Sequence, residues 1–238
     1  MDTDRDQNSF ILLKKNRFVD IQEVTTQILE EFPAGSPVPV VAGDLFAIAC
    51  TDTLDGTKYL LASFHGDTNG LATIPVLTAV HTFATTKAKD HKLLFGMDAN
   101  TYEKPAEDQQ GVTAFAKFYT SKNLNSCYGE NPDPTYYTTF HARTHLQPQL
   151  NKAVAYHEKD IKGDKNPKDF IIFFKSDFQV IRTHKDNTGE RKYIDHMIFP
   201  TLFFPSDHAI TSTVLGASDY ISAADFLRKE DGEKLKTI

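Results

Sequence analysis

Residues 205–214 read PSDHAITSTV, a stretch that indicates a strand with polar residues directly before it. Asp207 and His208 stand directly before an alternating run rich in β-branched residues, which predicts a strand over 209–215. Polar side chains at the ends of buried strands are where ligand sites tend to lie in sheet proteins. The stretch therefore predicts a sheet with a functional site at its edge.

Other apolar runs supply the rest of the sheet. DLFAIACT at 44–51 and KYLLASFH at 58–65 are joined by Asp55-Gly56, a hairpin signal. We also expect strands over 9–14, 91–99, 169–174, 178–184 and 193–199, and helices over 71–89 and 109–123. We expect helix or mixed structure over 18–32, long loops over 124–168, and a short charged helix from 222. Strands joined by both hairpins and helices predict an α/β (α+β) fold.

Length and composition fit one globular domain over residues 1–238. The chain has 26 basic and 32 acidic residues, a net charge of −6, which excludes a basic, nonspecific nucleic-acid coat protein. Two cysteines, Cys50 and Cys127, cannot form a disulfide framework, and we expect buried thiols. No apolar run is long enough to cross a membrane. The polar start is no secretory signal, so a cytoplasmic or nuclear location is the default expectation.

Four predicted strand ends carry polar residues. His65 ends one strand and runs into HGDTNG; Asp98 and Asn100 end another; Asp169 opens DFIIFF; Asp207 and His208 precede the last strand. Taken singly, each of these residues could simply form a turn. Their order along the chain is the informative feature.

That order, His … Gly-x-Asp-x-Asn … Asp-[aromatic]-Ile … Pro-Ser-Asp-His, resembles the endonuclease/exonuclease/phosphatase superfamily, the deoxyribonuclease-I-like enzymes. The resemblance spans roughly residues 9–216. GMDAN at 96–100 departs from the family's Gly-Asp-x-Asn by the inserted Met97. The resemblance implies a four-layer α/β/β/α sandwich of two mixed sheets and a hydrolase that cleaves phosphodiesters or phosphomonoesters with Mg²⁺ or Mn²⁺.

The resemblance also implies roles for the residues. Asp98 would orient and deprotonate water, Asn100 would donate to a phosphoryl oxygen, and His208 would contact the phosphate with a carboxylate behind it. His65 would be a second donor, and Asp207 would help to bind the metal. Asp169 is the favoured partner of His208, and Asp195 is the alternative.

The family's early metal-binding glutamate has no clear counterpart. Gln22-Glu23 matches the family's Gln-Glu pair in residue type, but no buried strand precedes it. Glu23 is therefore only a weak candidate ligand. We expect the chain to begin inside the family domain, with a missing segment or partner chain completing the sheet. The alternative is a catalytically impaired binding or scaffold module on the same fold.

Two more residues are candidate substrate contacts. Asn69 lies in the HGDTNG loop, where a helix N-cap is the alternative role. Arg143 lies in a region where the family places substrate-contacting loops, and its alternative is an ordinary surface position. The expected partner is a phosphate ester, with nucleic acid or nucleotide as the expected class.

Overall fold

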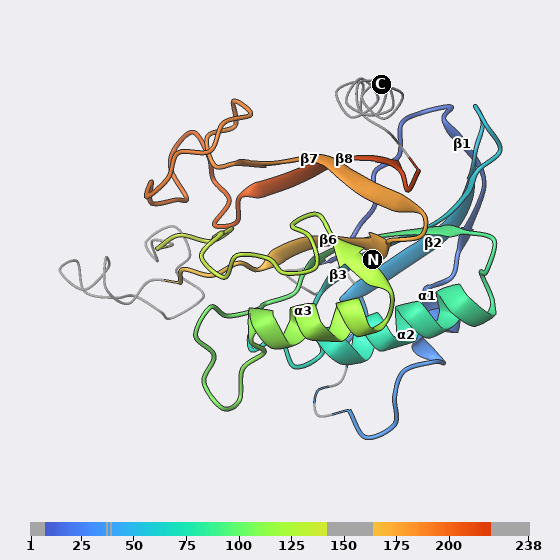
Figure 1. Cartoon of the computed structure of the whole chain (residues 1–238), viewed down its shortest axis with the longest axis horizontal. Coiled ribbons are helices and arrows are strands. Elements are labelled where there is room, and N and C mark those ends of the chain that lie inside the picture. The colour runs from blue at the N-terminus through green and yellow to red at the C-terminus, as the bar shows by residue number, and fades with distance from the viewer. Residues whose placement is uncertain (1–7, 37, 39, 142–163, 220–238) are drawn as a thin grey trace, which may run out of the picture.

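A six-stranded mixed sheet forms the centre of the molecule (Figure 1). The computed structural model describes residues 8–36, 38, 40–141 and 164–219. In sheet order the strands are β1 (Phe18–Glu23), β2 (Leu45–Asp52), β3 (Lys58–His65), β4 (Lys92–Asp98), β6 (Asp169–Phe174) and β5 (Leu124–Ser126). The β3–β4 pair is parallel and the other pairs are antiparallel.

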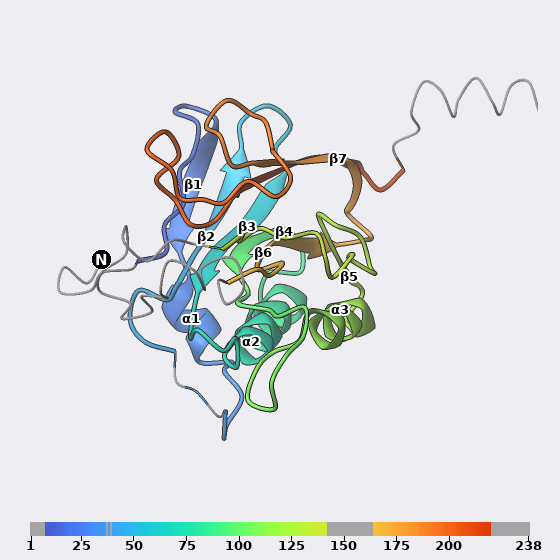
Figure 2. The same cartoon turned by 90° about the vertical axis from the view of Figure 1, so that its left-hand side faces the viewer.

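Helices α1 (Thr25–Leu29), α2 (Thr73–Thr86) and α3 (Val112–Ser121) lie together on one face of this sheet (Figure 2). Helix α2 is the crossover that the parallel β3–β4 pair requires. Pro75 sits in its first turn, where a missing N–H costs little. Leu77, Leu93 and Phe115 are fully buried in the core between helices and sheet.

Strands β7 (Phe178–Asp186) and β8 (Ile210–Ala217) form a second, antiparallel sheet over the opposite face (Figure 1). Aromatic rings join the two sheets: Tyr59 stacks on Phe178 with centroids 6.5 Å apart, and Phe173 meets Phe178 edge-on. The α/β class and the paired sheets agree with the expected fold. The described residues provide three of the four expected layers, and the second sheet is antiparallel rather than mixed.

Most expected elements are confirmed: strands at 44–51, 58–65, 91–99, 169–174, 178–184 and 209–215, and helices at 71–89 and 109–123. Two predictions are wrong. Residues 9–14 form no strand, because Ser9 bonds to the carbonyls of Gly43 and Asp44 and the segment has no ladder. Residues 193–199 form an irregular segment with one turn, because their apolar side chains pack in a separate cluster around Phe199 and Phe204.

The expectation of helix or mixed structure over 18–32 is confirmed, with β1 followed by the short α1. The expected loops over 124–168 contain the short strand β5. The expected helix from 222 lies outside the described residues.

Candidate active site

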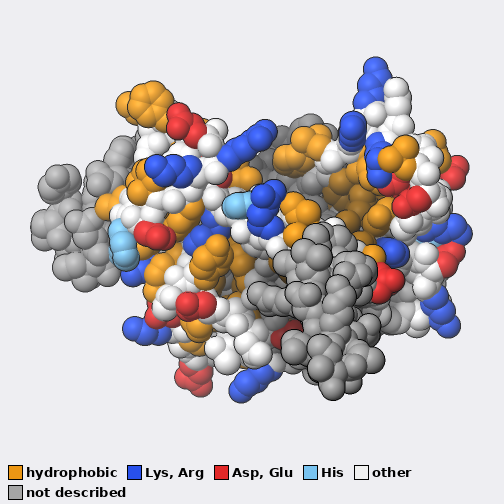
Figure 3. All heavy atoms as spheres, turned by 45° about the horizontal axis from the view of Figure 1, so that its top comes forward, with side chains coloured by type: hydrophobic (Ala, Val, Ile, Leu, Met, Phe, Trp, Pro, Cys, Tyr) orange, Lys and Arg blue, Asp and Glu red, His pale blue; other side chains and the backbone are white. Residues whose placement is uncertain are grey.

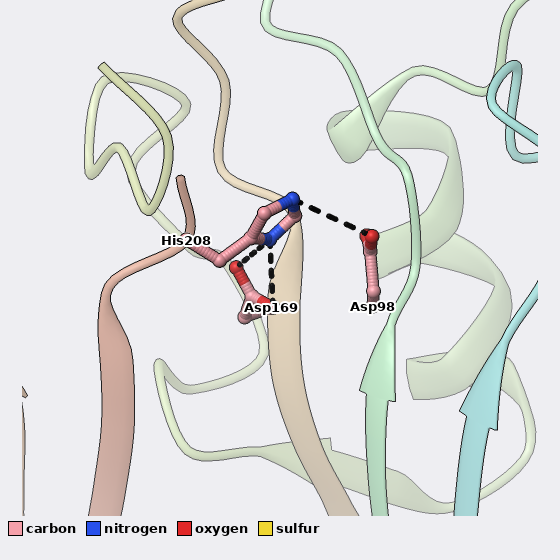
Figure 4. A group of neighbouring side chains, drawn as sticks. All are labelled: Asp98, Asp169 and His208. Carbon is pink, nitrogen blue, oxygen red and sulfur yellow. Dashed lines mark hydrogen bonds and ion pairs between the residues drawn. The ribbon is translucent and has the colours of Figure 1, made fainter. Parts of the chain in front are cut away.

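Strand register brings the predicted strand-end residues together. In the parallel β3–β4 pair, His65 is the register partner of Asp98, and in the antiparallel β4–β6 pair Asp98 is opposite Asp169. His208 reaches them from the segment before β8, as Figure 4 shows. Three neighbouring strands and one loop, distant in sequence, therefore supply one cluster of acids and imidazoles.

His208 lies between two carboxylates (Figure 4). Its Nδ1 is 2.9 Å from Oδ2 and 3.1 Å from Oδ1 of Asp169, and its Nε2 is 3.7 Å from Oδ2 of Asp98. Burial alone would lower the pKa of His208, but the charges of Asp169 and Asp98 outweigh it and raise the pKa to about 10. His208 is therefore held as an imidazolium, with Asp169 fixing its ring.

Asp98 is the most enclosed acid of the cluster, with a side chain only 8% exposed. Its Oδ2 is 3.3 Å from Nε2 of His65, and its Oδ1 accepts from the backbone N–H of Asn100 at 2.8 Å. Burial raises the pKa of Asp98, against the lowering effect of His208. A carboxylate with a raised pKa is suited to accepting a proton near neutral pH.

Asn100 is buried next to this cluster with a left-handed backbone, at φ +44°. Its side-chain Oδ1 accepts from Nζ of Lys168 at 3.0 Å. The turn that holds it packs closely against the loop after β3. Gly70 approaches the carbonyls of Ala99 and Asn100, and Thr73 donates to the Ala99 carbonyl at 2.8 Å.

Thr138 anchors the start of β6 beside the site. Its hydroxyl oxygen accepts from the backbone N–H groups of Lys168 and Asp169, at 2.8 and 3.1 Å. Its carbonyl accepts from the N–H of Ala209, directly after His208. Thr138 thus connects the two segments that carry Asp169 and His208. Sequence reasoning missed Thr138 and Lys168, since neither follows a periodic pattern or a strand-end motif that we used.

The other predicted site residues are placed differently. Asp207 is half-buried one residue before His208, and its charge contributes to the raised pKa of that histidine. Asn69 donates to Asp108 at 3.2 Å. The alternative role considered for Asn69 is to cap the start of the helix. Asp67 does this instead, since its carboxylate accepts from the N–H groups of residues 71 and 72. Arg143 lies outside the described residues.

Glu23 ends β1, at the edge of the sheet. Its register partner is Ile48 on β2, which pairs with Leu61 on β3, and Leu61 in turn pairs with Leu94 on β4. Glu23 is thus three strands and four residues from Asp98, a separation on the order of 20 Å. The structure does not bring Glu23 to the cluster.

A divalent cation fits the cluster by donor chemistry. Asp98, Asp169 and His208 each offer a ligand atom, and these atoms all lie within 4.8 Å of one another. Two carboxylates match the oxygen donors that Mg²⁺ and Mn²⁺ prefer, and Mg²⁺ commonly takes its remaining ligands from water and substrate phosphate. In the part of the chain that the structure describes, this candidate ligand set includes neither Asp207 nor Glu23.

No protein-family profile and no curated protein matches the sequence. Among solved structures, the chain is similar to D. rerio TDP2 complexed with a single-strand DNA product, at 12% identity and a TM-score of 0.46 over 84% of this chain and 68% of that chain. The human Nocturnin catalytic domain with bound sulfate gives 16% identity and a TM-score of 0.42, covering 84% and 61%.

A third similar structure is an endonuclease/exonuclease/phosphatase family protein from Bacteroides thetaiotaomicron, at 13% identity and a TM-score of 0.39, covering 72% of this chain and 54% of that chain. The chain therefore spans roughly half to two thirds of the length of these structures.

Proposed function

We propose that the chain is a divalent-metal-dependent phosphoesterase of the endonuclease/exonuclease/phosphatase superfamily. The observation that supports this proposal most is the pair of contacts around His208, with Asp169 behind the ring and Asp98 in front. Hydrolysis of a phosphate ester needs a base for water and cationic groups on the phosphate oxygens. The cluster supplies both within one site.

Asp98 is the proposed base. It takes a proton from the water that attacks phosphorus, as the bond from phosphorus to the leaving oxygen breaks. The imidazolium of His208 is positioned to neutralise charge on a phosphoryl oxygen, and Asn100 donates to another. His65, half-buried and 3.3 Å from Asp98, is the proposed donor to the leaving oxygen.

The carboxylates of Asp98 and Asp169 would hold the metal, because His208 as an imidazolium has no lone pair to offer it. When bound, a divalent cation would neutralise phosphate charge and lower the pKa of a bound water. The carboxylates of this chain would provide the negative charge that offsets the cost of dehydrating the ion.

We propose a nucleotide or short nucleic-acid segment as substrate. A net charge of −6 opposes binding of a long polyanion. On the face in Figure 3, Lys and Arg side chains are interspersed with acidic and hydrophobic ones, with no continuous basic stripe in view. One of the basic residues of β7, Lys185, is itself buried between the rings of Tyr136 and Tyr193.

Hydrolysis of bis-p-nitrophenyl phosphate and of p-nitrophenyl phosphate, with and without MgCl₂ or MnCl₂, tests the proposal. Metal-dependent release of nitrophenol that is lost in Asp98→Ala and His208→Ala is expected. The Asp195→Ala variant is the matched control, because Asp195 is exposed. An inactive, correctly folded wild-type chain at every metal concentration would contradict the proposal.

A binding module is the second candidate function. The observation that favours it is the metal-ligand set itself, which contains only Asp98 and Asp169 as carboxylates among the described residues. A chain that binds inorganic phosphate through His208 yet hydrolyses neither ester would be assigned this function instead.

A further inference from the structure

Lys168 is a buried cation immediately before Asp169. Its side chain is only 6% exposed, and its ammonium Nζ donates to Oδ1 of Asn100 and contacts Oδ2 of Asp164, both at 3.0 Å. The same ammonium lies 5.3 Å from the ring centroid of Tyr102. The carboxylate of Asp164 thus supplies a counter-charge for this buried ammonium.

An ammonium donates hydrogen bonds and accepts none. The atom of the Asn100 amide that faces Lys168 must therefore be the oxygen, and the amide NH₂ must point the other way. The structure gives this Nδ2 no acceptor among the described residues, and it is not one of the fully enclosed unpaired atoms. Nδ2 of Asn100, next to Asp98, can therefore donate a hydrogen bond to an acceptor atom of a ligand.

We propose that Lys168 is a positioning residue that fixes the amide of Asn100 with its NH₂ directed at a phosphoryl oxygen of the substrate. The inference rests on the proposed phosphoesterase function. Asp164 completes the arrangement because it holds the ammonium from a second direction. Without Lys168, the amide rotates between two nearly equivalent orientations, only one of which presents a donor.

This role differs from direct contact of Lys168 with the phosphate. If Lys168 acts through Asn100, replacing Lys168 does not change kcat further once Asn100 has been removed. If Lys168 acts by its own charge, replacing it still lowers kcat in the absence of the Asn100 amide. A double-mutant cycle separates these cases. The variants are Lys168→Met, Asn100→Ala and the pair together, with Lys87→Met as the control for loss of one positive charge at the surface.

Two measurements are made on each variant: kcat and KM for bis-p-nitrophenyl phosphate, and the Kd for inorganic phosphate by titration calorimetry. Lys168→Met is expected to lower kcat by about 10- to 100-fold, the usual effect of losing a residue that orients a ligand-binding group. The expected change in KM is smaller than the change in kcat. The double variant is expected to match Asn100→Ala, and Lys87→Met to match the wild type.

Lys168→Gln keeps a hydrogen-bond donor at this position and replaces Lys168→Met in the experiment if that variant fails to fold. Its kcat is expected to lie between those of Lys168→Met and the wild type. The positioning role would be overturned if the losses of kcat in Lys168→Met and Asn100→Ala multiplied in the double variant. It would also be overturned if Lys168→Met had the kinetics of the wild type. Either result would leave the phosphoesterase proposal intact. A wild-type chain that neither hydrolyses the diester nor binds phosphate would overturn both.

Discussion

Nδ1 of His208 lies 2.9 Å from Oδ2 of Asp169, although 39 residues separate the two in sequence. Asp169 opens β6 in the central sheet, and His208 precedes β8 in the second sheet. The contact therefore joins the two sheets at the site and fixes the orientation of the imidazole.

Replacement of Asp169 by Asn tests this contact. The amide keeps the shape of the side chain but removes the charge that favours the imidazolium, so kcat is expected to fall by about 10- to 100-fold, the usual effect of losing a residue that orients a functional group. Steady-state hydrolysis of the diester measures the loss. Asp195→Asn is the control, since Asp195 is the alternative partner considered from sequence and is exposed. Equal losses in the two variants would argue against the assignment.

The same contact makes stability depend on pH. The pKa of His208 is raised from 6.5 to about 10 in the folded chain, so the folded state binds its proton more tightly than the unfolded state. The stabilisation from the charged imidazole is therefore complete below about pH 6.5 and is lost as pH rises toward about 10.

Urea unfolding of the wild type and of His208→Asn, each with EDTA present, measures this dependence. The difference in unfolding free energy between them is expected to be larger near about pH 6 than near about pH 9. A difference that is constant or grows with pH would show that the imidazole is not charged in the folded state.

Metal binding at the cluster is expected to stabilise the fold. At a Mg²⁺ concentration of 100 times Kd, the free energy of unfolding is expected to increase by about 2.7 kcal/mol. Thermal unfolding of the EDTA-treated chain with added MgCl₂ measures the rise in Tm. Asp98→Asn should remove most of it, whereas Asp219→Asn, a change at an exposed acid, should not. The same rise in both variants would place the ion elsewhere.

The convergence of His65, Asp98, Asp169 and His208 could be predicted from sequence because each sits at the end of an apolar strand. The register of the sheet then brings them together, since the ends of β3 and β4 and the start of β6 lie at one edge. Thr138 and Lys168 could not be predicted in this way, because their positions depend on tertiary contacts between segments about 30 and 68 residues apart.

The mistaken strand at 193–199 has a related cause. Apolar residues such as Phe199 gave a strand-like pattern, but they pack with Phe140 and Phe204 in a small cluster beneath an irregular segment. Burial in a loop cluster and burial in a strand produce the same local signal in a short run.

Thr138→Val is a nearly isosteric change that removes the hydroxyl oxygen. The backbone N–H groups of Lys168 and Asp169 then lose their acceptor, and a buried donor left unpaired costs about 1–3 kcal/mol. Chemical denaturation should show a loss of at least this size, together with lower kcat because Asp169 shifts. Thr113→Val, at an exposed position of α3, should change stability by less than about 0.5 kcal/mol. Similar stability of the two variants would contradict the anchoring role of Thr138.

Gly70→Ala and Gly56→Ala separate backbone strain from steric overlap at the site. Both glycines have φ +73°, so an alanine at either position meets the same left-handed backbone cost, about 1–2 kcal/mol. A Cβ at Gly56 would meet nothing within 4 Å, whereas at Gly70 it would lie 2.6 Å from the carbonyl oxygen of Asn100 and 2.8 Å from that of Ala99.

The overlap at Gly70 involves backbone atoms that cannot move without displacing the turn that carries Asp98 and Asn100. Gly70→Ala should therefore lose about 1–3 kcal/mol more than Gly56→Ala in urea unfolding. It should also lower kcat for the diester, while Gly56→Ala keeps the wild-type value because its hairpin lies at the opposite end of β3 from His65. Equal losses of stability with unchanged kcat in both would mean that the loop after β3 does not hold the catalytic turn in place.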